Sequence, residues 1–220
     1  MNRFAATIAL SAALVLGSNH GIASEKVNTK DFSGWMENYD TLEYNQDRNA
    51  FIFSNEDKRG QYEKVRLVDV TLFGKNVEAN GELAQRAADY LRDGVNEIFA
   101  EEGVLATEPG PKVAALNLAI TGVEKSTESL KAHNLIPVSA VFRGAKAATG
   151  NLNTYIDVMF EGEATDSVSG ERLMAIVAKG IGDTEKKSGD ELEFEDLLPT
   201  LDRWLANYRE TLNAFLANRN

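Results

Sequence analysis

The chain has 220 residues, a formal net charge of −11 and no cysteine. The negative charge argues against a nucleic-acid partner, because phosphates require a basic surface. Without cysteine the chain has no disulfide and lacks the residue that bears the lipid of a bacterial lipoprotein, so we expect a soluble protein with no lipid anchor.

Residues 1–23 have the pattern of a secretory signal peptide. Arg3 is basic, residues 4–17 form an uncharged apolar run, and residues 18–23 are small and polar. The apolar run is shorter than the roughly 20 residues that a membrane span needs. We expect cleavage after Ala23 or Ser24, export to the periplasm or beyond the cell, and no membrane span in the mature chain.

Residues 24–31 are polar and predict a flexible lead-in, and residues 32–220 predict a single domain. Within it, residues 34–40 favour a short helix, residues 50–53 an edge strand and residues 62–73 a longer strand. Residues 79–102 carry apolar side chains at helical spacing, and Gly103 is a natural helix stop.

The second half begins with a buried strand over residues 113–123 and a short helix over 138–149. Alternating apolar residues predict two strands, 152–160 and 171–181, that form a hairpin, followed by a loop over 182–193. Residues 197–217 predict a long C-terminal amphipathic helix. This order indicates an α+β fold, a mainly antiparallel sheet with helices packed on one face.

The candidate chemical groups are few. After cleavage His133 is the single histidine, whereas a zinc site takes three or four His or Cys ligands. Asp157 and Glu161 share a strand face, which we expect to be solvated, with a cross-strand ion pair to Arg172. Two carboxylates could also serve a glycosidase. We predict no catalytic, cofactor-binding or metal-binding residue, and no cofactor.

Four aromatic residues in the terminal helical segments offer a ligand-binding alternative. Trp35, Tyr39, Trp204 and Tyr208 would line a cleft between those segments, or would simply belong to the core, since each lies on an apolar helical stripe.

The stretch Asp166-Ser-Val-Ser-Gly-Glu171 falls between the two strands of the predicted hairpin. Asp166 and Ser167 can hydrogen-bond nearby backbone amides, and Gly170 can adopt a positive φ. We interpret these three residues as a structural turn and not as a reactive loop.

Four stretches resemble, in the same order, a bacterial family of exported envelope proteins, the domain-of-unknown-function family 3313. They are residues 32–42, 109–123, 135–138 and 166–173, and a closing Trp204 in a C-terminal helix also fits. Many proteins of that family are lipoproteins, a feature from which this chain departs because it has no cysteine. The family implies no established activity.

The sequence therefore favours a non-enzymatic periplasmic binding or envelope-accessory domain, whose partner is an envelope protein or a small ligand. Two alternatives stay open: a carboxylate-dependent envelope hydrolase, and a structural or assembly subunit.

Overall fold

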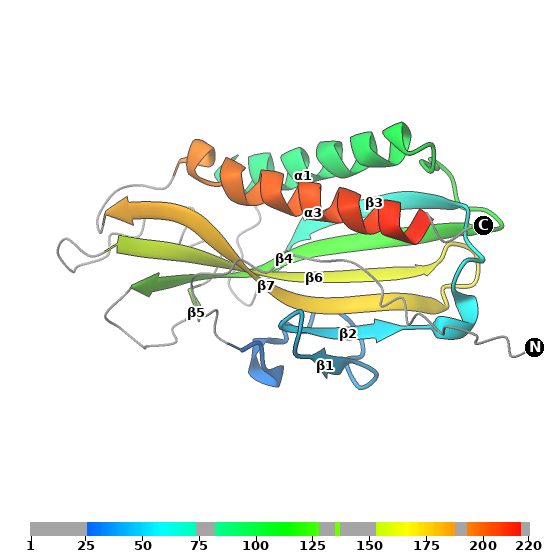
Figure 1. Ribbon diagram of the computed structural model, residues 1–220, viewed down its shortest axis with the longest axis horizontal. Helices are drawn as coiled ribbons and strands as arrows, with labels where there is room; N and C mark the ends of the chain where they lie inside the picture. Colours follow the sequence, from blue (N-terminus) through cyan, green and yellow to red (C-terminus); the bar gives the residue numbers. More distant parts are fainter. Residues whose placement is uncertain (1–25, 74–81, 128–134, 137–152, 188–192, 217–220) are drawn as a thin grey trace, which may run out of the picture.

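The computed structural model describes residues 26–73, 82–127, 135–136, 153–187 and 193–216. Its main feature is a seven-stranded sheet with the order β1-β2-β7-β6-β4-β3, in which β5 pairs with β4 beyond the end of β3. Two long helices, α1 and α3, lie side by side over one face of this sheet (Figure 1). All strand pairs are antiparallel except β3 with β4, which confirms the predicted α+β fold.

The elements have the following bounds. The strands are β1 Glu43–Asn45, β2 Ala50–Ser54, β3 Lys64–Leu72, β4 Val113–Thr127, β5 Leu135–Ile136, β6 Asn153–Asp166 and β7 Arg172–Lys187. The helices are α1 Glu82–Glu101 and α3 Leu198–Leu216, with short 3-10 turns η1 Thr29–Asp31, η2 Glu56–Lys58 and η3 Phe194–Asp196.

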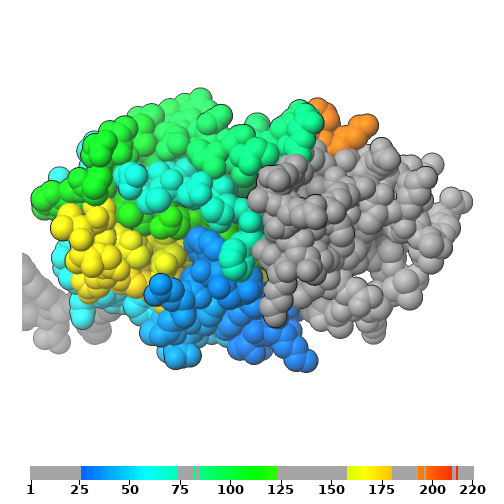
Figure 2. All heavy atoms as spheres, turned by 180° about the vertical axis from the view of Figure 1, so that it is seen from behind, coloured from blue at the N-terminus to red at the C-terminus, as the bar shows by residue number. Residues whose placement is uncertain are grey.

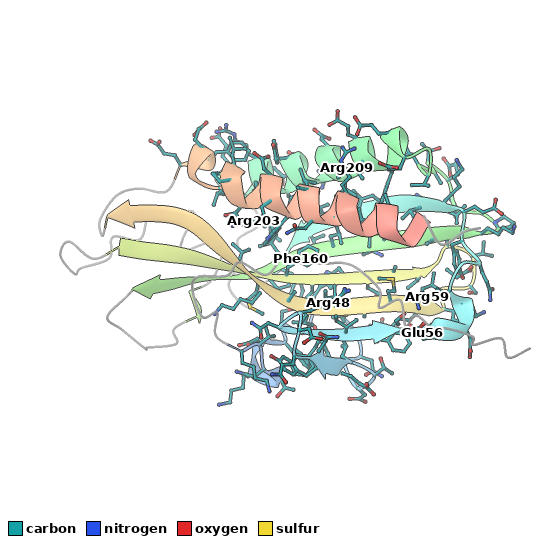
Figure 3. The ribbon with its side chains drawn as sticks, viewed as in Figure 1. Arg48, Glu56, Arg59, Phe160, Arg203 and Arg209 are labelled. Carbon is teal, nitrogen blue, oxygen red and sulfur yellow. The ribbon has the colours of Figure 1, made fainter. Side chains whose placement is uncertain are left out.

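The helical face of the sheet holds the larger hydrophobic core. Alternate residues of each strand point to this face, and they meet the apolar stripes of both helices. Phe160 of β6 (labelled in Figure 3) contacts Trp204 of α3 edge to face, with ring centroids 5.5 Å apart. The other buried members include Leu91, Val95, Ile98, Leu116, Leu118, Ile120, Ile176, Leu201 and Leu212.

The opposite face carries a second core, which neither α1 nor α3 covers. Here the odd-numbered residues Met159, Ala175 and Val177 are buried by the N-terminal segment. We call residues 27–42 the strap, because they cross this face before β1 begins. Figure 2 shows this segment in blue, beside the yellow end of the β6–β7 hairpin.

The strand β3 contains an irregularity that the alternation did not predict. Its pairing with β4 shifts between Leu67 and Asp69, so Val68 is the extra residue of a β-bulge. As a result Leu67 and Val70 both pack against the helical core, while Val68 is 42% exposed. A strict two-residue period would have placed Leu67 and Val70 on opposite faces.

Two local predictions are wrong. Residues 34–40 form no helix: Gly34 has φ +85°, and the backbone N–H groups of Gly34 and Met36 donate to the hydroxyl of Tyr39. The strand at 50–53 is not at the edge, because β2 pairs with both β1 and β7.

Other segments also differ from expectation. Within the predicted lead-in, Val27 is fully buried, and Asn28 and Asp31 form a capping box around η1. The predicted loop at 182–193 begins later, because β7 continues to Lys187. The predicted helix at 138–149, His133 and the signal peptide lie outside the described residues.

Candidate functional site

The most unusual group in the described part of the chain is the carboxylate of Glu161. It lies in the middle of β6, opposite Ala119 of β4 and Val177 of β7, and its relative exposure is 0%. The expectation of a solvated face at this position is therefore wrong. The strap covers β6 at this position. The alternation of apolar and polar residues along β6 does not predict this burial. The side chain of Asp157, the other acid of that expectation, lies outside the described residues.

Both oxygens of Glu161 are hydrogen-bonded by the strap. The backbone N–H of Ser33 donates to Oε1 at 2.9 Å, and the hydroxyl of Tyr39 donates to Oε2 at 2.7 Å. The Tyr39 oxygen accepts in turn from the N–H of Gly34 at 3.0 Å and of Met36 at 3.1 Å. Burial, and then the bond to Glu161, raise the pKa of Tyr39. The Tyr39 hydroxyl thus connects the backbone of the strap to the carboxylate of Glu161.

The next acid on this face, Glu163, has a different partner. Arg172 Nε lies 2.6 Å from Glu163 Oε1 across the β6–β7 pair, so the partner of Arg172 is Glu163 and not Glu161, as the prediction had it. The same guanidinium donates from Nη1 to the carbonyl oxygen of Asn38 at 2.7 Å. Glu161 and Glu163 therefore both hold the strap, the first directly and the second through Arg172.

The four aromatic candidates do not share one cleft. Trp35 and Tyr39 pack into the strap-covered core, whereas Trp204 and Tyr208 pack into the helical core on the other side of the sheet. Tyr208 meets Phe99 at 5.8 Å between ring centroids, and burial raises its pKa. The strap and the two helices cover opposite faces of the sheet, so the sheet lies between the two pairs of aromatic residues.

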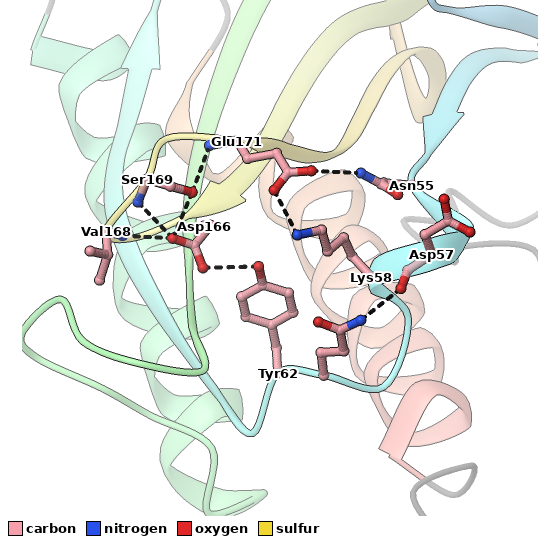
Figure 4. A network of polar contacts seen from close by, with 9 residues as sticks. Asn55, Asp57, Lys58, Tyr62, Asp166, Val168, Ser169 and Glu171 are labelled. Atoms are coloured by element: carbon pink, nitrogen blue, oxygen red, sulfur yellow. Dashed lines mark hydrogen bonds and ion pairs between the residues drawn. The ribbon is translucent and has the colours of Figure 1, made fainter.

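A second organised region lies at one end of the sheet, where β6 turns into β7. We call residues 166–171, with the 55–62 segment that contacts them, the hairpin end (Figure 4). Asp166 Oδ1 accepts from the N–H groups of Val168 at 3.0 Å and Ser169 at 2.7 Å, and Oδ2 accepts from the Tyr62 hydroxyl at 2.9 Å. These bonds, the Ser169 N–H first and then Tyr62, lower the pKa of Asp166 to about 2. Burial, and then the bond to Asp166, raise the pKa of Tyr62 to about 12.

The turn is also fixed to its neighbours. The Ser167 hydroxyl accepts from the N–H of Gly110 at 3.0 Å and donates to the carbonyl of Gly110 at 3.1 Å. Glu171 pairs with Lys58 at 2.8 Å, and Gly170 has φ +74°. The structure thus brings two of the resembling stretches, 109–123 and 166–173, into direct contact.

One apolar side chain projects from this rigid end. Val168 is 70% exposed, compared with 42% for Val68 and 38% for Phe73, the other exposed large hydrophobic residues in the described segments. The sequence pattern located the turn, but Tyr62 and Lys58 come from a separate segment whose sequence gives no sign of this role. A protruding valine held on a hydrogen-bonded turn can contact a partner without first being ordered.

The described residues contain no group of three or more His, Cys, Asp or Glu side chains arranged to hold a metal ion. In the same part of the chain, neither helix combines the length and the apolar character that crossing a bilayer requires.

Comparison with known proteins yields one family. The model of a protein of unknown function, DUF3313, matches residues 31–208. Among curated proteins the chain is 24% identical over 207 residues to the uncharacterized lipoprotein YdcL of Escherichia coli strain K12, covering 90% of this chain and 91% of that one. The protein of the same name from Escherichia coli O157:H7 matches equally.

This relative corrects one prediction. YdcL is a lipoprotein, and a lipoprotein carries a lipid anchor, so the expectation of no lipid anchor is contradicted. The expectation rested on one feature, the absence of the cysteine that bears the lipid. The match to the lipoprotein, in contrast, covers 90% of this chain.

Among solved structures, the PelC dodecamer from Paraburkholderia phytofirmans covers 76% of this chain and 95% of its own, with 11% identity and a TM-score of 0.30. A point variant of that protein gives the same TM-score with 13% identity. At this TM-score the likeness carries no argument about assembly.

Proposed function

This chain belongs to the DUF3313 family of proteins of unknown function, and on that premise we propose that it is a non-enzymatic accessory domain of the bacterial envelope. Its likeness to a lipoprotein indicates an exported, envelope-associated protein. We place it in the periplasm, with residues 1–23 as the signal peptide and residues 32–220 as one domain. Sequencing of the exported protein's N-terminus tests the cleavage site, and a retained Met1 would contradict it.

The hairpin end supports binding of an envelope protein. Three segments far apart in the chain meet there, and side-chain hydrogen bonds hold the turn at both of its ends. Such preorganisation lowers the entropy that a binding surface loses on association. The exposed Val168 is the single observation that carries the proposal, because an apolar tip on a rigid polar support suits a partner's apolar pocket.

The carboxylates on the strap-covered face favour this function over the hydrolase alternative. A glycosidase needs one carboxyl group to donate a proton and another to act on the sugar or on water. Here Glu161 accepts two hydrogen bonds from the strap, and Glu163 pairs with Arg172. Both acids thus have a structural use.

Photo-crosslinking in living cells tests the proposal. A photoreactive amino acid replaces Val168 in the full-length chain, and the control replaces Ala100, which is exposed on α1. We expect one discrete crosslinked product of larger mass from position 168 and none from position 100, with the partner identified by mass spectrometry.

Three other outcomes have distinct meanings. A product that contains two copies of this chain would favour the assembly subunit instead. Equal patterns at both positions would contradict a binding role for the hairpin end. Hydrolysis of envelope glycan by the pure protein, lost in Glu163→Gln, would restore the enzyme alternative.

A further inference from the structure

The strap closes over an apolar surface. Val27 is fully buried, Met36 is 4% exposed and Leu42 is 9% exposed, and they pack against Met159 and Val177 of the sheet. Further cover comes from partly buried aromatic residues of the strap: Phe32, Trp35 and Tyr39. The rings of Phe32 and Tyr39 are stacked with centroids 4.5 Å apart. Among the described residues, the strap thus supplies most of the apolar cover of Met159, Ala175 and Val177.

The strap is attached differently from every strand beside it. The pairs β4–β6 and β6–β7 are continuous backbone ladders over most of their length. In the described part of the chain, each hydrogen bond between the strap and the rest of the fold has a side chain as one partner: Glu161, Arg172 or Asn49. The strap can therefore lift without breaking any backbone pair of the sheet, which is the property of a separately opening unit.

Glu161 accepts two of the hydrogen bonds that attach the strap to the sheet. When the strap is closed, the carboxylate is removed from water, which costs free energy unless its oxygens are hydrogen-bonded. Both of its bonds come from the strap, from Ser33 and Tyr39. When the strap lifts, both bonds are lost together and the carboxylate is hydrated, so the group stabilises the closed strap only while the whole contact is made.

From this geometry we propose that residues 27–42 are a hinged cover that opens and closes as one unit over the second face of the sheet, with Glu161 as its latch. Opening uncovers the apolar strip of β2, β6 and β7 while the sheet and the helical core stay folded. The inference concerns the face away from Val168 and does not depend on the proposed partner of the hairpin end.

Hydrogen exchange of the full-length protein, followed by mass spectrometry of peptides, tests it. In the wild type we expect peptides from residues 28–42 to exchange faster than peptides from residues 158–165 of β6. In Glu161→Gln we expect strap exchange to rise about tenfold or more, as is typical for the loss of hydrogen bonds to a charged group, with β6 unchanged. Tyr39→Phe removes one of the two bonds and should give a smaller rise.

Glu171→Gln is the matched control, because it removes the same negative charge at the hairpin end, where Glu171 pairs with Lys58 and not with the strap. Strap and β6 peptides that exchange at one common rate in the wild type, and accelerate together in Tyr39→Phe, would overturn the proposal, because the strap would then open only with global unfolding. If Glu161→Gln does not fold, the comparison of Tyr39→Phe with the wild type still decides between the two results.

Discussion

At the scale of single residues, the hairpin end depends on backbone geometry that few side chains tolerate. Gly170 has φ +74°, and an ideal Cβ there would meet no atom within 4 Å. A substitution would therefore be strained by its backbone conformation alone and not by crowding. The requirement for glycine at position 170 is therefore conformational and does not come from packing.

We expect Gly170→Val to lower the free energy of unfolding by about 1–2 kcal/mol or more, because a β-branched residue is disfavoured in the left-handed region. Urea titration followed by circular dichroism measures the change. Gly110→Ala is the control, since its Cβ would make an ordinary 3.8 Å contact with Val113. Equal stability of the wild type and Gly170→Val would show that the turn adopts another conformation in solution.

Asp166 gives a prediction in pH. Its pKa is lowered from 3.8 to about 2 in the folded protein, so it stabilises the fold above its unfolded pKa, and that contribution is lost as the pH falls through about 2. The difference in Tm between the wild type and Asp166→Asn should be constant above about pH 5 and shrink between about pH 4 and pH 2. A difference that grows on acidification would contradict the assignment.

A matched control is Asp57→Asn. Gln61 donates to the backbone carbonyl of Asp57, which the substitution keeps. The partners of Asp166 are Tyr62, Val168 and Ser169, so its hydrogen bonds also stay in place. We expect this variant to keep the acid-dependent loss of Tm that comes from Asp166.

At the scale of elements, α1 and α3 approach closely at a glycine. A Cβ built on Gly94 would lie 2.4 Å from Leu205 Cδ1 and 3.2 Å from its Cγ. The glycine therefore lets α3 pack its leucine directly onto the backbone of α1, although glycine weakens a helix by about 1 kcal/mol relative to alanine.

A double-mutant cycle measures this contact. Gly94→Ala should be more favourable in a Leu205→Ala background than in the wild type, by about 1–3 kcal/mol in the free energy of unfolding, because the smaller side chain removes the clash. Additive effects of the two substitutions would mean that Leu205 moves aside without cost.

The elements also show what sequence patterns can and cannot predict. The period of two along β6 and β7 and the helical stripes of α1 and α3 follow from burial on one face, so local spacing predicts them. The strap escaped prediction because its shape depends on Tyr39, whose hydroxyl meets Glu161 from 122 residues away. The burial of Glu161 has the same cause, since its partners belong to a segment without a repeating pattern.

At the scale of the whole molecule, the two outer edges of the sheet are protected from pairing with other chains. β1 is only three residues long. β3 is bent by its bulge at Val68, and Arg92 of α1 pairs with Asp69 at 3.0 Å and donates to the carbonyl of Val70 at 3.3 Å. Short strands, bulges and charges are known devices against edge-to-edge aggregation.

We therefore expect Arg92→Leu to self-associate, because the edge of β3 loses its charged cover and keeps the exposed Val68. Light scattering after gel filtration should show a mass that increases with protein concentration. Arg86→Leu makes the same charge change on α1 at a residue that pairs with Glu195, away from β3, and should behave as the wild type does. Identical masses for both variants would show that Arg92 is not needed to protect the edge.

The contact between the strap and Glu161 also affects the order in which the segments fold. Ser33 and Glu161 are 128 residues apart, so during synthesis the strap cannot dock until β6 has been made and paired. Contacts of such long sequence separation form late. We expect the strap to be among the last segments to dock, with Trp35 exposed until then. We therefore expect docking of the strap to be a late step in the folding of this protein.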